Sequence, residues 1–319
     1  ILGILSDGKF HSGEGLGDEL GITRTAIWKL IKKLTAYGLD IHAVRGKGYR
    51  LPGQIELLES DRIEKKINNH ARKLINQFEV TGVIDSTNQY LLEKLDTGNI
   101  HGHVVLAEYQ TSGRGRRGNA WISPIGAGIT LSFGWHFDEL SDSTHVLSLV
   151  MGVAIIRVLN RAGITGVGLK WPNDILWRQY KLGGILLEMR GETNGPVDVV
   201  FGMGINVNFP ETQIAGISQP WTDITGITQN PPSRNELAAD LISESFLMLE
   251  NFSHEGIAEI LNEWRQYDCI HGRHAMLILP GRQIRGEVIG IDEQGALLMS
   301  VHGKEKRFSA GEIRLRVTS

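Results

Sequence analysis

The first recurring hydrophobic pattern lies near the start of the chain and predicts two short helices. Leu16 and Leu20 form one apolar face, with Ser12 suited to cap the helix and Gly21 to end it. After Thr23, a second possible cap, apolar residues recur at the i, i+3, i+4 and i+7 spacing of a buried helix face. They are Ala26, Ile27, Leu30, Ile31 and Leu34. Two short helices joined by a glycine-containing turn form a helix-turn-helix.

The segment after the second predicted helix has the pattern of a β-hairpin. Residues 41–51 read I-H-A-V-R-G-K-G-Y-R-L, which is a short strand, a Gly-x-Gly turn and a second strand. Such a hairpin would be the wing of a winged helix-turn-helix domain, for which we expect the bounds 1–53. An amphipathic helical hairpin with a solvated basic face is the alternative.

Residues 61–270 combine helical and strand patterns without strict βαβ order, which predicts an α+β domain with a mixed or antiparallel sheet. The predicted helices are Asp61–Leu74, Asn88–Leu95, Thr144–Asn160, Arg234–Asn251 and His254–Tyr267. The third of these is apolar on most faces and should be buried against the sheet. The predicted strands include His103–Ala107, Gly128–Phe137, Leu182–Met189 and Val197–Val207. Short alternating strands from residue 272 onward predict a small β-barrel at 271–319.

Charge is distributed unevenly along the chain. The whole chain has a formal charge of −3, yet residues 24–50 hold seven basic side chains against one acid, Asp40, a local excess of +6. Such asymmetry is expected of a nucleic-acid-binding module joined to a different domain. Candidate DNA contacts on the second helix and the wing are Thr23, Arg24, Thr25, Trp28, Lys29, Lys32, Lys33, Arg45 and Lys47.

The overall composition is that of an ordinary globular protein, with 41% hydrophobic and 22% charged residues. No apolar run approaches the roughly 20 residues that a membrane span needs, and no secretory leader is visible. The single cysteine, Cys269, allows no internal disulfide and fits a reducing compartment. We therefore expect a cytoplasmic protein with no membrane partner and no structural metal site.

The segment after the strand at 103–107 is rich in glycine and arginine. Tyr109 to Trp121 reads Y-Q-T-S-G-R-G-R-R-G-N-A-W. Glycine lets the backbone approach a ligand closely, and arginine offers planar forks that suit carboxylate and phosphate oxygens. The composition suits a loop that encloses a small anion, although a flexible solvated turn has the same composition. No Gly-Lys-Ser/Thr follows, so the segment is not a Walker loop.

Other polar residues lie at the ends of predicted strands. The D-S-T run at 85–87 stands before a predicted helix, where hydroxyls either bind a polar ligand head or simply cap the helix. Pro172 interrupts the next apolar segment, L-K-W-P-N-D-I-L. That segment should therefore turn and present Lys170, Asn173 and Asp174.

Four motifs occur in one order along the chain. They are D-S-T-N at 85–88, G-R-G-R-R-G at 113–118, K-W-P-N-D at 170–174 and K-L-G-G-I-L at 181–186. This ordered set resembles the biotin–protein ligase family. With the N-terminal winged helix, the chain resembles the bifunctional form that is also the repressor of the biotin operon. The resemblance covers essentially the whole chain and implies a class II synthetase-like central domain with a C-terminal SH3-like β-barrel.

The resemblance implies a two-step acyl transfer. ATP would activate biotin to biotinyl-5′-AMP, with Mg²⁺ accompanying the ATP. Biotin would then pass to a specific lysine of the biotin carboxyl carrier protein of acetyl-CoA carboxylase. The adenylate-bound homodimer would bind operator DNA of the biotin biosynthesis genes and repress their transcription.

Site residues follow from the same motifs. The resemblance implies two catalytic residues, Arg116 to close over the carboxylate and phosphate and Lys181 to stabilise charge at the reacting centre. The implied biotin site comprises Ser86, Thr87, Asn88, Gln110, Gly113, Arg114, Gly115, Arg116, Lys181 and Gly184. The implied nucleotide site comprises Trp121, Lys170, Asn173, Asp174, Asn206 and Trp221. Trp221 follows Pro220 in a segment that departs from the family's pattern.

Two other functions remain as alternatives. A lipoate–protein ligase shares the fold class and the adenylation chemistry, although the G-R-G-R-R-G loop together with K-W-P-N-D favours biotin. A transcription regulator that only senses a ligand would have a damaged catalytic set, whereas Arg116 and Lys181 are both present.

Overall fold

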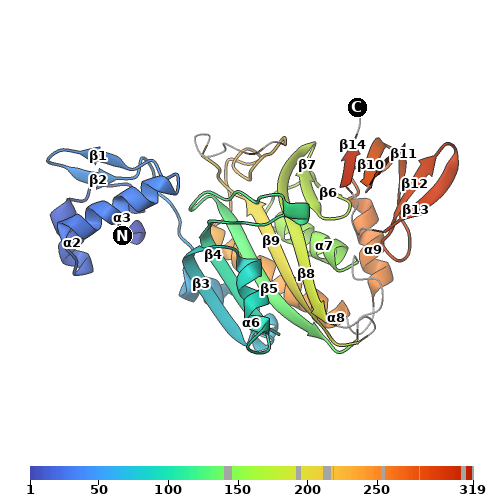
Figure 1. Cartoon of the computed structure of the whole chain (residues 1–319), viewed down its shortest axis with the longest axis horizontal. Helices are drawn as coiled ribbons and strands as arrows, with labels where there is room; N and C mark the ends of the chain where they lie inside the picture. Colours follow the sequence, from blue (N-terminus) through green and yellow to red (C-terminus); the bar gives the residue numbers. More distant parts are fainter. Residues whose placement is uncertain are drawn as a thin grey trace.

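The computed structural model describes residues 1–139, 146–191, 195–210, 217, 219–252, 256–279, 281–309 and 314–317. These residues form a small N-terminal lobe, a central domain built on a large sheet and a small C-terminal sheet, arranged side by side (Figure 1). No helix within these ranges is long and apolar enough to cross a membrane.

The N-terminal lobe is a winged helix. Its helices are α1 (Leu2–Leu5), α2 (Gly13–Leu20) and α3 (Arg24–Ala36). Strands β1 (His42–Val44) and β2 (Gly48–Arg50) pair in antiparallel register. The predicted wing is therefore confirmed, and the helical hairpin is excluded.

The predicted helix caps of this lobe are also confirmed. Ser12 Oγ accepts a hydrogen bond from the backbone N–H of Gly15 at 2.9 Å, and Thr23 Oγ1 accepts one from Ala26 at 3.3 Å. Gly21 ends α2 in the left-handed region, at φ 65°. Each cap satisfies backbone groups that the helix itself leaves unpaired.

The N-terminal lobe packs around a hydrophobic cluster separate from the main core, in which Ile27 and Ile31 of α3 are buried. Ile125 of the central domain also belongs to this cluster, and Tyr109 of the central domain packs against it. Leu30, predicted to lie on the same buried face, is 36% exposed, so that prediction is wrong. A lobe of three short helices covers only a narrow stripe of α3, centred on the i, i+4 pair of isoleucines. Leu30 lies at the edge of that stripe.

The central domain contains a seven-stranded sheet with the order β3-β4-β5-β9-β8-β7-β6. Strands β3 and β4 are parallel, and the other neighbours are antiparallel. The predicted mixed sheet is thus confirmed. The strands are β3 (Gln77–Ile84), β4 (His103–Gln110), β5 (Gly128–Phe137), β6 (Val167–Lys170), β7 (Asp174–Trp177), β8 (Tyr180–Gly191) and β9 (Val197–Asn206).

Helices cover both faces of this sheet (Figure 1). Helix α6 (Thr87–Leu95) lies in front of it, and α7 (Val146–Arg161) and α8 (Arg234–Phe252) lie behind it. Almost every described side chain of α7 is buried, as its apolar pattern predicts. Helix α9 (Ile257–Gln266) follows α8. The predicted helix starts at Thr144 and His254 lie outside the described residues.

The single helix predicted at Asp61–Leu74 is instead two helices, α4 (Ser60–Lys66) and α5 (Asn69–Lys73). Asn68 interrupts them because its Oδ1 accepts a hydrogen bond from the backbone N–H of His70 at 2.8 Å, which caps α5. Asparagine favours such caps over a helix interior.

The C-terminal part is a five-stranded antiparallel sheet with the order β13-β12-β11-β10-β14. Its strands are β10 (His274–Leu279), β11 (Arg282–Ile291), β12 (Leu297–Val301), β13 (Lys304–Phe308) and β14 (Arg314–Val317). Its buried side joins the hydrophobic core of the central domain. The predicted β-rich C-terminal unit is therefore packed directly against the central domain.

Candidate active site

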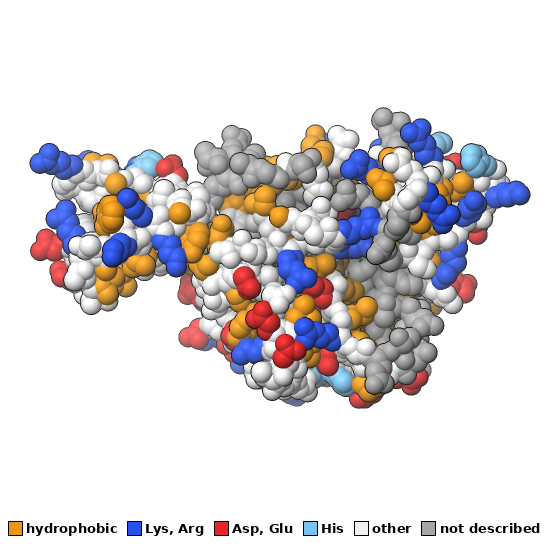
Figure 2. All heavy atoms as spheres, viewed as in Figure 1, with side chains coloured by type: hydrophobic (Ala, Val, Ile, Leu, Met, Phe, Trp, Pro, Cys, Tyr) orange, Lys and Arg blue, Asp and Glu red, His pale blue; other side chains and the backbone are white. Residues whose placement is uncertain are grey.

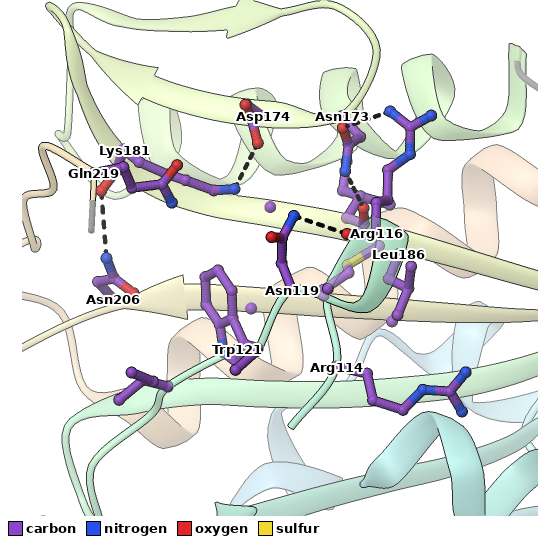
Figure 3. A pocket seen from close by; sticks show the side chains of 18 of the residues that line it. Arg114, Arg116, Asn119, Trp121, Asn173, Asp174, Lys181, Leu186, Asn206 and Gln219 are labelled. Carbon is purple, nitrogen blue, oxygen red and sulfur yellow. Dashed lines mark hydrogen bonds and ion pairs between the residues drawn. The ribbon is translucent and has the colours of Figure 1, made fainter. Parts of the chain in front are cut away.

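A cavity of about 670 Å³ lies in the central domain, over the strands β4, β5, β8 and β9 (Figure 3). The segment 114–122, the β6–β7 turn, residues 219–221 and part of β14 complete its wall. All the residues predicted for biotin and nucleotide line this cavity, with the exception of Gly113. Motifs from four separate stretches of sequence therefore meet in one place.

Gly113 lies beneath the loop and does not line the cavity. Its carbonyl oxygen accepts a hydrogen bond from the backbone N–H of Trp121 at 2.8 Å, which closes the loop at its base. A Cβ at Gly113 would overlap the carbonyl oxygen of Trp121 and would stand 2.8 Å from Gln110 Nε2. Glycine is needed here so that the two ends of the loop can meet.

Hydroxyl and amide groups at the start of α6 form one end of the cavity. Ser86 caps the helix, and the backbone N–H of Thr87 donates to Gln110 Oε1 at 2.8 Å. Ser132 Oγ of β5 lies 2.6 Å from both Thr87 Oγ1 and Asn88 Oδ1. These side chains are buried, so this polar end is shielded from bulk water. Such an arrangement suits a neutral polar head with several donors and acceptors.

Two glycines of β9 give the cavity its floor. A Cβ at Gly202 would overlap the side-chain amide of Asn88, and a Cβ at Gly204 would overlap the indole ring of Trp121. Trp121 therefore lies directly against the backbone of β9. Its Nε1 is buried and has no hydrogen-bond partner within the described residues.

A cluster of opposite charges lies at the other end of the cavity (Figure 3). Lys181 Nζ is 2.6 Å from Asp174 Oδ1, and Lys170 Nζ is 3.1 Å from Asp174 Oδ2. Burial alone would raise the pKa of Asp174, but the two ammonium groups outweigh it and hold this pKa below its usual range. Asp174 therefore fixes two cations at the cavity wall.

Two of the three arginines of the loop, Arg114 and Arg116, point in different directions (Figure 3). Arg116 Nη1 donates to Asn173 Oδ1 at 3.2 Å, on the side of the charged cluster. Burial, together with Arg117, lowers the pKa of the Arg116 guanidinium. Arg114 turns toward α6 and binds Gln89 and Glu188, with nitrogen–oxygen distances of 2.6 and 2.5 Å.

The segment around Trp221 is attached to the same wall by backbone hydrogen bonds. The N–H of Lys181 donates to the carbonyl of Pro220 at 3.0 Å, and the N–H of Thr222 donates to the carbonyl of Lys181 at 2.9 Å. Asn206 Nδ2 donates to the carbonyls of Lys181 and Thr222, at 3.3 and 2.9 Å. Trp221 is thereby held at the cavity, where its ring contacts Phe209.

Sequence reasoning missed several residues of this site. Ser132 and Arg316 line the cavity, and Glu188 binds Arg114 behind it. Ser132 belongs to an apolar strand and Arg316 to the distant C-terminal sheet. Only alternation along β5 marks Ser132 as facing the same way as Thr130, and no local signal points to the other two.

Positive charge dominates the cavity. Six of the described lining side chains are basic, and one, Asp174, is acidic. The basic residues are Arg114, Arg116, Arg117, Lys170, Lys181 and Arg316. A low-dielectric cleft with this excess attracts anions. The arrangement suits positioning and charge stabilisation of anionic reactants.

The predicted DNA contacts lie together on the N-terminal lobe, where all of them are exposed. Figure 2 shows lysine and arginine side chains spread over this lobe. Lys32 Nζ stands 3.9 Å above the ring of Trp28, on the solvent face of α3. The lobe thus presents the helix and wing surface that a duplex would require.

Comparisons with known proteins match each part of the chain. The model for the biotin/lipoate A/B protein ligase family matches residues 80–206, an HTH domain model matches 1–50, and the biotin protein ligase C terminal domain matches 270–316. The bifunctional ligase/repressor BirA of Salmonella typhimurium is 41% identical, with 99% of this chain and 96% of that protein covered. BirA of Escherichia coli is 40% identical, again with 99% of this chain and 96% of that protein covered.

A solved structure adds to these sequence relatives. Biotin protein ligase from Aquifex aeolicus in complex with biotin and ATP superposes with a TM-score of 0.64 at 26% identity, and covers 76% of this chain and all of that one. The fold and family expected from the four motifs are confirmed. The chain belongs to the biotin–protein ligase family, in the bifunctional form that joins a ligase to a DNA-binding repressor domain.

Proposed function

We propose that this protein activates biotin with ATP and transfers it to a lysine of a biotin carboxyl carrier protein. A biotin carboxylate oxygen would attack the α-phosphorus of ATP, the bond to the β-phosphate would break, and pyrophosphate would leave. The carrier lysine amine would then attack the acyl carbon of biotinyl-5′-AMP, and AMP would leave as the amine loses a proton.

The observation that carries this proposal is the division of one cavity into two chemically different ends. Arg116, Lys170 and Lys181 surround its charged end. Hydroxyl and amide groups of buried residues line the other end. A ligand with a neutral polar head and a carboxylate tail would bridge the two, and its carboxylate would lie beside the cations that bind the α-phosphate.

The predicted roles fit this arrangement. We assign charge stabilisation at the reacting centre to Lys181 and Arg116, since preorganised cations act most strongly where water is excluded. Asp174 would hold Lys181 and Lys170 in place. The nucleotide base would pack near Trp121, whose buried N–H has no partner among the described residues and could donate to a ligand acceptor.

Mg²⁺ fits this site as an ion carried by ATP. Among the described residues, no group of three or more His, Cys, Asp or Glu side chains is placed to hold a metal. Asp174, the one acidic group among the described lining residues, is already paired with two lysines. Phosphate oxygens and water would therefore supply most of the ligands, as Mg²⁺ commonly requires. When bound, the ion would offset triphosphate charge.

The N-terminal lobe supports the second half of the proposal, repression of biotin biosynthesis genes in the cytoplasm. The adenylate-bound protein would dimerise and place two winged helices on a palindromic operator. Contacts from Lys29, Lys32 and the wing to phosphates would supply most of the affinity, which should fall steeply with salt.

The proposal is tested by incubating the full chain with MgATP and either biotin or lipoate, and then measuring the acyl-adenylate. Biotinyl-5′-AMP should form with biotin and little adenylate should form with lipoate. Lipoyl-adenylate as the main product would favour a lipoate ligase. Biotin binding without any adenylate would favour a regulator that only senses its ligand.

A further inference from the structure

Glu188, on β8, uses both of its carboxylate oxygens within the site. Oε1 accepts from Arg114 Nη2 at 2.5 Å, and Oε2 accepts from Asn88 Nδ2 at 3.0 Å. The Glu188 side chain is 19% exposed, whereas that of Arg114 is 41% exposed. A second hydrogen bond, to Gln89 Oε1 at 2.6 Å, fixes Arg114 against α6.

These contacts continue into the polar end of the cavity. The Asn88 amide that binds Glu188 also accepts from Ser132, and Ser132 reaches Thr87, which is bonded to Gln110. Gln110 is the last residue of β4, where the loop begins. Glu188 thus connects Arg114, which directly follows the base of the loop at Gly113, to the buried groups at the start of the loop.

The direction of Arg114 follows from this attachment. Its side chain points away from the Asp174–Lys181 pair, while Arg116 points toward Asn173 (Figure 3). Because its charge is matched by Glu188, Arg114 contributes less to an anion in the cavity than an unpaired arginine at the same place would. The bonds of Arg114 to Gln89 and Glu188 would instead fix the loop against α6 and β8.

We propose that Glu188 is a positioning residue for biotin binding, and that Arg114 acts through it as the anchor of the loop rather than as the cation that meets the substrate carboxylate. This inference rests on the proposed function. A loop that is already in its binding conformation before the ligand arrives binds the ligand more tightly. The apparent affinity is the intrinsic affinity multiplied by the fraction of molecules in that conformation.

The effect of Glu188→Gln on biotin affinity depends on whether Arg114 anchors the loop or binds the substrate carboxylate. If Arg114 were the substrate's cation, Glu188 would compete with biotin for it. Removing the negative charge in Glu188→Gln would then strengthen biotin binding. If Glu188 instead holds the Arg114 side chain in place, the same substitution weakens biotin binding, because a neutral amide binds a guanidinium less strongly than a carboxylate does. The sign of the change therefore decides between the two arrangements.

The experiment measures the Kd for biotin by calorimetry and the KM and kcat of adenylate formation for Glu188→Gln. We expect a rise of about five- to tenfold in Kd and in KM for biotin, the size of one partly exposed charged hydrogen bond. The kcat at saturating biotin and the KM for ATP should change little. Glu59→Gln is the matched control, because Glu59 also pairs with an arginine, Arg62 at 3.0 Å, but neither residue contacts Arg114 or lines the cavity, and it should leave biotin affinity unchanged.

A double-mutant cycle completes the test. Arg114→Gln and Glu188→Gln should each weaken biotin binding, and the double variant should be no weaker than the worse single variant. Tighter binding in Glu188→Gln, no change in it, or additive losses in the double variant would overturn the inference. An unaltered protein that binds no biotin would instead refute the proposed function.

Discussion

Lys181 and Asp174 form an ion pair with a nitrogen–oxygen distance of 2.6 Å, at the wall of the cavity that also holds Trp121. Both side chains are 18% exposed, so the pair is largely shielded from solvent. Asp174 shares its other oxygen with Lys170. The carboxylate therefore orients two ammonium groups without needing to contact a substrate itself.

Lys181→Ala should reduce the rate of adenylate formation by about 10²- to 10³-fold, the loss seen when one preorganised charge-stabilising donor is removed. Asp174 keeps Lys170 as a partner, so the fold should persist. The measurement is pyrophosphate release with biotin and MgATP, together with a urea unfolding curve. Lys94→Ala, on the exposed side of α6, is the control and should retain full activity. Full activity in Lys181→Ala would show that the role is assigned to the wrong residue.

Asp174 should also make stability depend on pH. Its folded pKa lies below the usual 3.8, so the ionised carboxylate stabilises the fold above that value, and this stability is lost as the pH falls through the lowered pKa. Asp174→Asn should therefore be less stable than the unaltered protein near pH 7, by about 1–3 kcal/mol. The difference should shrink below about pH 4.

Urea unfolding over a pH series measures this difference. Asp138→Asn, which alters an exposed carboxylate, should show no comparable loss at neutral pH. The two lysines would not stabilise the ionised carboxylate if the difference in unfolding free energy between Asp174→Asn and the unaltered protein stayed constant to low pH, or widened.

Gly204→Ala should displace Trp121 from the cavity floor. The added methyl group would overlap the indole ring, so the ring must leave its place against β9. We expect nucleotide affinity to fall by about tenfold or more, the loss of one well-placed aromatic contact, and stability to fall by about 1–3 kcal/mol from overpacking. Calorimetric titration with ATP measures the first effect. Gly82→Ala on β3, where a Cβ meets nothing within 4 Å, should change neither quantity.

The buried pair Glu108–Arg234 should hold residues 54–59, the linker between the N-terminal lobe and α4 of the central domain. The two side chains are 6% and 4% exposed, and the Arg234 guanidinium also donates to the carbonyls of Glu56 and Gly128. Arg234→Met would leave a buried carboxylate unpaired and should cost about 3–5 kcal/mol in urea unfolding.

The combined variant Glu108→Gln/Arg234→Met should recover part of that loss, because no unpaired charge then remains. Arg190→Met, which removes an exposed ion pair with Asp96, should leave the unfolding midpoint unchanged. Equal effects of the buried and exposed substitutions would contradict this interpretation of Glu108 and Arg234.

Much of the fold could be predicted from local pattern. Ser12 and Thr23 are helix caps in the sequence and in the structure, and the Gly-x-Gly turn predicts the wing. Caps and tight turns are decided by neighbouring residues, so the sequence alone contains the required information. The break at Asn68 was missed because its Oδ1 caps a new helix within a continuous helical pattern.

The site was predictable where the sequence concentrates its chemistry in short motifs. Most residues of the motifs at 85–88, 113–118, 170–174 and 181–186 line one cavity, and Gly113 supports the loop from below. Glu188 and Arg316 could not be predicted in the same way. Their positions depend on the register of β8 and on the packing of the C-terminal sheet, which are long-range properties.

The proposed function requires that one cavity joins biotin to ATP and delivers the biotinyl group to a carrier lysine. The most direct test incubates the full chain with biotin, MgATP and a biotin carboxyl carrier domain, and then measures the mass of the carrier. The carrier should gain one biotinyl group, only when both biotin and MgATP are present and only when its acceptor lysine is intact. A carrier of unchanged mass, in a sample where the protein is folded and binds both biotin and ATP, would contradict the proposed function.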